Sequence, residues 1–231
     1  MITFKDIIDW SEAWALLIPL TFYFIWKPKD AWIKPVIIYV IIAFLLNLTA
    51  DIIWKSHFLS IDKQISKIFS FLYIPKYKQI SNNLFYNLHS IFRLLLFAWF
   101  FYKLDPVFFK KLNRVIIPVF IVFNFINFTF YSKIIVLPNS PLFAVESALL
   151  LLYCIFYFIR INKDDRLMNP FSEAPLRIVG GLTLYNAINF PIFIFYDYLM
   201  SSNEKYSENI WTVHNITYIV LNIMIAFSFK K

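Results

Sequence analysis

Polar side chains that could do chemistry recur four residues apart inside long apolar stretches of this sequence. Asn47 and Asp51 form one such pair, His89 and Arg93 form a second, and Glu146 lies in a further apolar stretch. Residues four apart share one face of a helix, so each pair would present a polar stripe to its neighbours. The remaining candidates lie toward the C-terminus and comprise Asn186, Asn189, His214, Tyr218 and Asn222.

Arg93 is the candidate that most requires a partner. A guanidinium group stays charged and carries five N–H donors, so its burial demands a carboxylate or several carbonyl oxygens. Glu146 and Asp51 are the acidic residues that we expect at a suitable depth. We therefore predict an Arg93–Glu146 ion pair with His89 beside it, which serves either to bind a ligand or only to hold the helices together.

The chain around these groups is strongly apolar. Of its 231 residues, 60% are hydrophobic and only 16% are charged, whereas soluble proteins average about 45–50% apolar and roughly 25% charged residues. A single cysteine, Cys154, excludes a disulfide scaffold, and the presence of only two glycines argues against phosphate-binding loops. The sequence thus predicts an all-α polytopic membrane protein with a single transmembrane domain over residues 1–231.

Seven stretches are long and apolar enough to cross a bilayer, which takes about 20 residues of helix. They cover residues 10–26, 31–54, 83–104, 114–131, 140–161, 178–200 and 210–229. The first stretch is expected to be a retained helix, because its leader lacks the net positive charge of a signal peptide.

Basic residues outside the spans divide unequally between the two sides of this seven-transmembrane-helix bundle. Thirteen lie on the side of the C-terminus and eight on the side of the N-terminus. The positive-inside rule therefore predicts that the N-terminus is outside and the C-terminus is cytoplasmic. A basic rim facing anionic lipid then accounts for the net charge of +8 without any nucleic-acid partner.

The connector between the second and third spans contains an amphipathic segment. Ile61, Ile65, Ile68 and Leu72 fall on one helical stripe, which favours an interfacial helix over residues 61–73. If this segment crossed the membrane instead, the chain would have eight spans and the later helices would be inverted. Its charged residues argue against that alternative.

Six of the seven predicted spans place polar groups in the outer half of the bilayer, while the inner half is almost wholly apolar. If these polar faces converge, they line a pocket near the outer surface. Asparagines also form hydrogen bonds between membrane helices, so a purely structural role stays open. Pro191, within the sixth stretch, removes a helix hydrogen bond and predicts a kink that could act as a hinge.

Three other membrane chemistries fit these residues less well. A retinal protein needs a lysine in the last span, and residues 210–229 contain none. A metal-dependent hydrolase needs about three ligands, yet no two histidines are closely spaced on one helix, and Arg93 would repel a cation beside His89. A transporter would favour mid-span glycines and a polar inner half. We therefore expect no cofactor and no metal, and we favour a non-enzymatic role over an enzymatic one.

The pattern Trp211-x-x-His214 followed by Asn222, together with His89, Glu146, Asn186 and Asn189, resembles a family of uncharacterised bacterial seven-transmembrane-helix proteins of about this length. The resemblance extends over nearly the whole chain. It implies the architecture and the importance of these positions, and it implies no activity.

These patterns favour a sensor or receptor-like protein of the bacterial cytoplasmic membrane that binds a small polar or amphipathic ligand. Arg93 would hold an anionic group, Glu146 would balance that charge, and His89, His214 and Asn189 would form hydrogen bonds. A rearrangement near Pro191 would carry occupancy to a cytoplasmic or membrane partner protein. The alternatives are a small-solute transporter, a structural or accessory subunit, and an intramembrane metal-dependent hydrolase.

Overall fold

The computed structural model of the chain describes residues 4–56, 61–74, 79–131, 134, 139–163, 174–196, 198–199 and 204–230. In these ranges the regular structure is helical, apart from a pair of two-residue antiparallel strands. The strands are β1 (Tyr73–Ile74) and β2 (Gln79–Ile80), with Tyr73 opposite Ile80. The prediction of an all-α chain is confirmed in this sense.

Five helical stretches of the described chain are long and apolar enough to cross a membrane. They are Ile33–Trp54, Asn83–Leu104, Pro106–Tyr131, Ser140–Asn162 and Asn209–Ser228. The helices that contain them are α4 (Ile33–Trp54), α6 (Asn83–Leu104), α7 (Pro106–Ile126) with the π-helical turn η2 (Asn127–Tyr131), α8 (Ser140–Asn162) and α11 (Glu204–Ser228). Length and composition therefore support a polytopic membrane protein.

The predicted first span is interrupted in the structure, and its apolar helical stretch, Ser11–Trp26, is shorter than the five given above. Residues 10–26 contain two helices, α2 (Ser11–Trp14) and α3 (Leu17–Trp26), preceded by α1 (Phe4–Asp9). Pro19 has no N–H group, and the amide of Leu16 donates to the oxygen of Ala13, three residues back, at 3.3 Å. The ten residues of α3 extend only about 15 Å, half of the hydrocarbon thickness.

The predicted sixth span corresponds to α9 (Ala174–Ile194), which is 21 residues long but is not among the five apolar stretches. Arg177, Asn186 and Asn189 lower its apolar character. The helix ends three residues after Pro191, whose missing N–H group leaves the oxygen of Ala187 without its helical donor.

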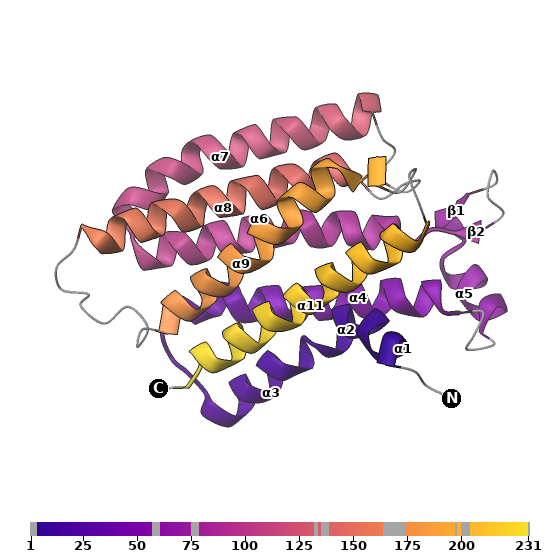
Figure 1. Ribbon diagram of the computed structural model, residues 1–231, viewed down its shortest axis with the longest axis horizontal. Helices are drawn as coiled ribbons and strands as arrows, with labels where there is room; N and C mark the ends of the chain where they lie inside the picture. The colour runs from indigo at the N-terminus through magenta and orange to yellow at the C-terminus, as the bar shows by residue number, and fades with distance from the viewer. Residues whose placement is uncertain are drawn as a thin grey trace.

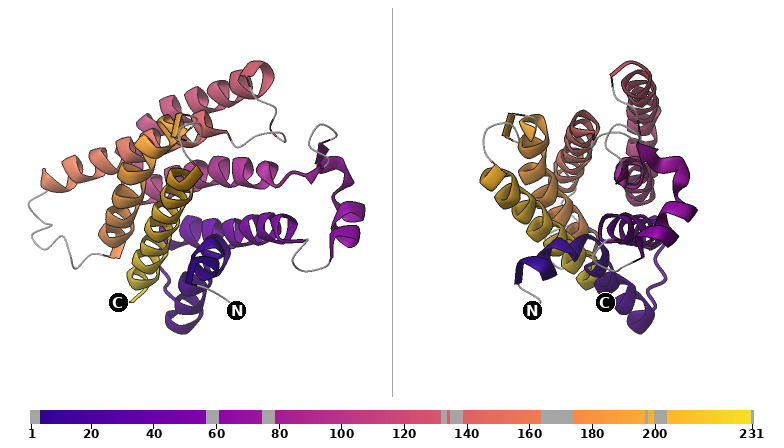
Figure 2. Two further views of the ribbon diagram at one scale, coloured as in Figure 1. Left: turned by 45° about the vertical axis from the view of Figure 1, so that its right-hand side comes forward. Right: turned by 90° about the vertical axis from the view of Figure 1, so that its right-hand side faces the viewer.

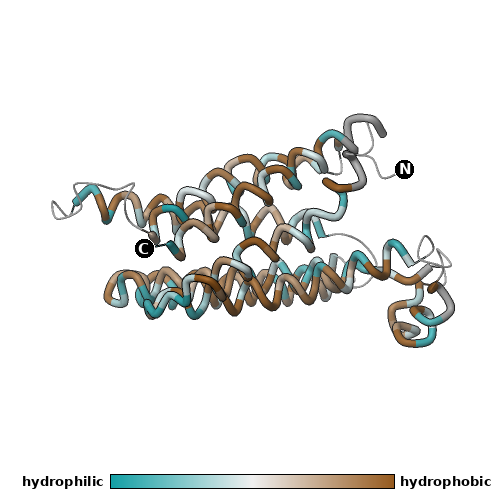
Figure 3. The backbone as a smooth tube through the Cα atoms, turned by 90° about the horizontal axis from the view of Figure 1, so that it is seen from below, coloured by the Kyte–Doolittle hydropathy of each residue, from teal (hydrophilic) through white to brown (hydrophobic). Residues whose placement is uncertain are grey.

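The long helices run back and forth along one axis of the molecule (Figure 1), and the two termini lie at opposite ends of that axis. α4 packs along α6, and α9 packs against both α8 and α11 (Figure 2). α7 lies at the edge of the bundle, against α6 and α8. Most of the strongly hydrophilic positions lie toward the helix ends (Figure 3), as expected for helices whose middle sections face lipid or one another.

An aromatic core fills the half of the bundle opposite the N-terminus. Phe97, Phe101, Phe109 and Tyr153 are fully buried in one apolar cluster, and the rings of Phe101 and Tyr153 stack with centroids 5.2 Å apart.

A side chain fixes where the helix α7 begins. The Asp105 carboxylate accepts a hydrogen bond from the amide of Phe108 at the start of α7, as the N-cap of a helix does.

The predicted interfacial helix over residues 61–73 is present as the shorter helix α5 (Asp62–Ile68), followed by the 3₁₀ turn η1 (Ser70–Leu72). Its apolar stripe does not act as one surface. Ile65 and Leu72 are buried against Ile53 of α4, whereas Ile68 is 63% exposed. The segment therefore covers the ends of α4 and α6.

Candidate functional site

A cavity of about 460 Å³ lies at the end of the bundle near α1 and α5. It is walled by the last turn of α4, the C-terminal half of α9, the N-terminal halves of α6 and α8 and the middle of α11, with α1 and α2 at one side. Its lining residues are Asp9, Glu12, Asp51, Trp54, Lys55, Asn82, Asn83, Tyr86, His89, Ser90, Arg93, Ser140, Phe143, Tyr185, Phe193, Tyr196, Trp211, His214 and Tyr218. The rim includes the exposed Trp54 and the half-buried Asn82 and Asn83, so the cavity opens at this end.

An ion pair between α6 and α8 forms the floor of the cavity. Nε and Nη2 of Arg93 donate to the two carboxylate oxygens of Glu146, the second at 2.5 Å. The Ser90 hydroxyl also donates to Glu146 at 2.8 Å, and Nη1 of Arg93 donates to the hydroxyl of Tyr185 at 2.6 Å. Arg93 and Glu146 are 4% and 0% exposed. A bidentate pair with these extra hydrogen bonds is the arrangement that compensates buried charges.

A second polar group joins α9, α11 and α2 through His214. The Asn189 amide nitrogen donates to the oxygen of Tyr185 at 2.7 Å and to the hydroxyl of Thr217 at 2.9 Å. This fixes the Asn189 oxygen as the acceptor for Nδ1 of His214, at 2.6 Å. Nε2 of His214 then faces a carboxylate oxygen of Glu12 at 3.3 Å.

Tyrosines connect His89 to the rest of the floor. Nε2 of His89 lies 3.3 Å from the hydroxyl of Tyr39, and the two rings stack. The Tyr39 hydroxyl is 3.5 Å from that of Tyr218. The Asn47 amide donates to the Tyr218 hydroxyl at 3.4 Å and to the backbone oxygen of Glu12 at 2.9 Å. Asn47 therefore fixes the broken N-terminal segment to α4.

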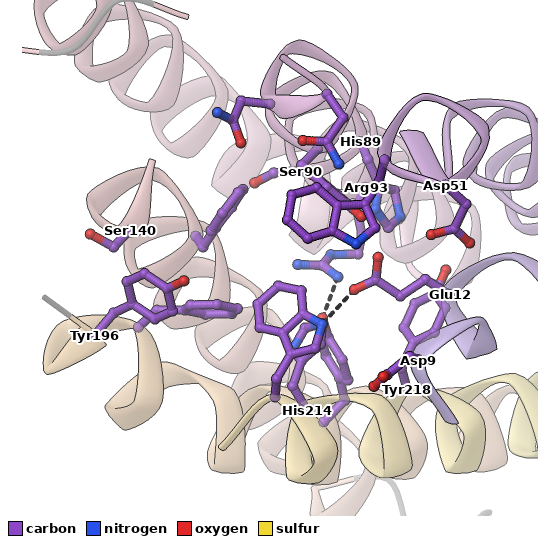
Figure 4. A pocket seen from close by; sticks show the side chains of 18 of the residues that line it. Asp9, Glu12, Asp51, His89, Ser90, Arg93, Ser140, Tyr196, His214 and Tyr218 are labelled. Atoms are coloured by element: carbon purple, nitrogen blue, oxygen red, sulfur yellow. Dashed lines mark hydrogen bonds and ion pairs between the residues drawn. The ribbon is translucent and has the colours of Figure 1, made fainter. Parts of the chain in front are cut away.

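Acidic groups gather on one side of the cavity (Figure 4). Asp51 and Glu12 are 3% and 7% exposed, and their two carboxylates interact electrostatically across the cavity wall. Asp9 lies nearer the rim. Lys55, one turn after Asp51, donates to the backbone oxygen of Asp9 at 3.3 Å and lies over the ring of Trp10.

The structure brings most of the predicted site residues into this region. Five of them line the cavity, namely His89, Arg93, Asp51, His214 and Tyr218. Three more hold lining residues from behind, namely Glu146, Asn47 and Asn189. The amide nitrogens of Asn186 and Asn222 bond to the helical oxygens of Leu182 and Tyr218, and neither residue reaches the cavity. Pro191 does not line it either.

Two expectations about this layer are corrected. Glu146 and Asp51 are not the only acidic residues at this depth, because Glu12 lies beside them. Asn124 and Asn127, the polar groups of the predicted fourth span, also lie elsewhere, because α7 and η2 are at the edge and supply none of the cavity's lining residues.

Several site residues were missed in the sequence. Glu12 falls inside the predicted span 10–26, and an acidic residue in an apolar span is itself a signal of function. Tyr39, Tyr185 and Ser90 carried no comparable signal, because tyrosine and serine are common in membrane helices as packing residues. Among the residues that the structure describes, no three histidine, cysteine, aspartate or glutamate side chains are placed to hold a metal ion.

No protein family, curated protein or solved structure matches this chain. The resemblance to bacterial seven-helix proteins therefore stays a prediction.

Proposed function

We propose that the chain is a seven-helix receptor-like membrane protein that binds a small polar or amphipathic molecule in the cavity between α4, α6, α8, α9 and α11. The observation that carries this proposal is the cavity itself, whose floor is a buried, bidentate ion pair with further hydrogen bonds to Ser90 and Tyr185. Its volume of about 460 Å³ is within the range of small-molecule sites, about 300–1,000 Å³.

The lining also supports a binding role over a purely structural one. Groups that only hold helices together satisfy their hydrogen bonds within the protein. Here Asp51 is a lining residue of the cavity, and its buried Oδ2 atom has no hydrogen-bond partner among the residues that the structure describes. Maintaining such a group in a folded protein is costly, so its retention favours a function for it.

A receptor or sensor is supported better than a transporter. The cavity ends at Arg93, Tyr185 and Tyr218, and the next layer contains the buried Phe97 of the aromatic core. A transport path would have to cross this close-packed core, which has few polar groups to replace the hydration of a solute. Occupancy could instead change the packing of α9 beyond Pro191 and reach a cytoplasmic or membrane partner protein.

The topology that we propose has seven spans, with α2–α3 as the first and α9 as the sixth. The N-terminus and the cavity would face outward from a bacterial cytoplasmic membrane, and the C-terminus would be cytoplasmic. The excess of basic residues on the side of the C-terminus supports this orientation.

Thermal unfolding of the purified protein in detergent tests the binding proposal. We expect at least one compound from a panel of neutral, anionic, cationic and zwitterionic small molecules to raise the melting temperature, since a ligand stabilises the state that binds it. The comparison protein carries Arg93→Met and Glu146→Gln together, which removes the polar floor without leaving one charge unpaired. A compound that binds in the cavity should raise the melting temperature of this variant less than it raises that of the wild-type protein.

Two outcomes would contradict the proposal. One is that no compound in the panel stabilises the wild-type protein. The other is that a folded double variant responds to every compound as the wild type does, which would assign the ion pair to helix packing alone.

A further inference from the structure

We infer that the ligand of this cavity is a monovalent organic cation, a small molecule that presents an ammonium group. This inference rests on the proposed binding function and names the chemical class that the site selects. It replaces the expectation that Arg93 holds an anionic group, because Arg93 already directs three of its N–H donors to Glu146 and Tyr185.

Carboxylates outnumber the lysine and arginine side chains in and directly behind the lining. Glu146 offsets Arg93, and Glu12 faces His214. Asp51 and Asp9 then remain against a single cation, Lys55. His89 lies one helical turn from Arg93, where a second positive charge would be repelled. A chain with a net charge of +8 thus has a cavity in which acidic side chains outnumber lysine and arginine, which favours a cationic ligand.

Asp51 identifies where that ammonium would bind. Its side chain is 3% exposed and lines the cavity, and its buried Oδ2 atom has no hydrogen-bond partner in the described part of the chain. Glu12 lies on the same side (Figure 4), with its carboxylate reaching toward His214. An ammonium donor between Asp51 and Glu12 would supply the missing hydrogen bond and the missing charge together. Charge-assisted hydrogen bonds of this kind are about twice as strong as neutral ones.

Aromatic rings complete the recognition of a cation. Eight of the lining residues are aromatic: Trp54, Tyr86, Phe143, Tyr185, Phe193, Tyr196, Trp211 and Tyr218. The faces of such rings attract ammonium groups, and quaternary ammonium sites are commonly aromatic cages. The same rings give an apolar surface for the rest of the molecule, whereas an anion would meet both the ring faces and the carboxylates with repulsion.

Three probes with closely matched skeletons test the charge preference: 2-phenylethylamine, 2-phenylethanol and 3-phenylpropionate. Isothermal titration calorimetry with the full chain in detergent micelles should show the amine binding at least about tenfold more tightly than the alcohol, and no binding of the carboxylate. Asp51→Asn should weaken the amine at least about tenfold and leave the alcohol unchanged. Asp30→Asn, an exposed aspartate between α3 and α4, is the matched control and should bind the amine as the wild type does.

The melting temperature of the protein without ligand distinguishes a carboxylate that binds a ligand from one that only stabilises the fold. Because Asp51→Asn removes a buried charge without a hydrogen-bond partner, the variant without ligand should melt at or above the wild-type temperature while it loses affinity for the amine. If Asp51→Asn does not fold, Glu12→Gln provides the same comparison from the other carboxylate. Equal binding of the amine by wild type and a folded Asp51→Asn variant would overturn the inference.

The outcomes separate this inference from the binding proposal. Preferential binding of 3-phenylpropionate in a manner that depends on Arg93 would overturn the cation preference and leave a ligand-binding cavity standing. Failure of every compound, in this series and in the wider panel, would overturn both.

The ammonium group could belong to a free amine or to an ethanolamine lipid headgroup. Nanodiscs of phosphatidylglycerol with and without phosphatidylethanolamine distinguish these sources. Loss of 2-phenylethylamine binding when phosphatidylethanolamine is present would assign the site to the lipid headgroup, and unchanged binding would assign it to a free amine.

Discussion

Arg93 and Glu146 are the residues whose separate loss should harm the protein most. Removing either side chain leaves the other charge buried, which costs about 3–5 kcal/mol, whereas removing both costs much less. We expect Arg93→Met alone to lower the free energy of unfolding by about that amount, and the double variant with Glu146→Gln to recover a large part of it. Unfolding in detergent micelles measures both. Equal destabilisation by the single and double variants would mean that the two charges are not coupled.

Comparing two buried asparagines can distinguish a positioning role from simple helix packing. Asn189 bonds to Tyr185, Thr217 and His214, whereas Asn222 bonds only to the oxygen of Tyr218 and has an amide oxygen without a partner in the described part of the chain. Asn189→Leu should therefore cost about 1–3 kcal/mol of stability. Asn222→Leu should be nearly neutral, because it also removes an unsatisfied buried oxygen. Melting temperatures of the two variants make the comparison, and a larger loss for Asn222→Leu would contradict it.

At the scale of the helices, the sequence predicted the elements whose ends carry explicit signals. The span predicted over 83–104 coincides with α6, and that over 140–161 ends one residue before α8 does. Asn139 caps α8 by accepting a hydrogen bond from the amide of Leu142, as its position before Ser-Pro suggests. The break at Ala15 and Leu16 was missed, although Pro19 is a sequence signal of the same kind as Pro191.

The candidate site was harder to predict than the helices. Periodicity indicates which residues share a face, so His89 with Arg93 and Asn47 with Asp51 could be grouped in advance. It does not indicate which helix each face meets, since helix rotation and neighbours depend on packing across the whole bundle. For this reason the polar groups of the fourth span, together with Asn186 and Asn222, were placed in the site although they lie outside it.

The contact between α9 and α11 depends on one of two adjacent glycines. A Cβ atom on Gly181 would lie 3.0 Å from Cβ of Met224 and 3.2 Å from Cδ1 of Leu221, whereas one on Gly180 would approach Met224 no closer than 3.9 Å. Gly181→Ala should destabilise the protein by about 1–3 kcal/mol through overpacking. Gly180→Ala, its matched control, should be neutral or stabilising, because alanine favours a helix by up to about 1 kcal/mol. Thermal unfolding checks the pair, and equal effects would contradict close packing at Gly181.

For the molecule as a whole, polar and apolar regions are separated along its length. One end of the bundle holds the cavity with Arg93, Glu146 and the acidic residues, and the other half holds the aromatic core around Phe101. Such a division suits a protein that receives a ligand from one side of a membrane and closes off the other. Its biological meaning depends on which side the cavity faces.

Cysteine labelling can determine that side. Cys154, the single native cysteine, is buried, so introduced thiols can be read against a low background. Gln64 and Asp30 are exposed and lie at opposite ends of α4. With the N-terminus outside, Gln64→Cys should react with a membrane-impermeant maleimide in intact spheroplasts, and Asp30→Cys should react only after lysis. The reverse pattern would turn the cavity toward the cytoplasm. Labelling of both in intact spheroplasts would mean that α4 does not cross the membrane, and the seven-span topology would then be wrong.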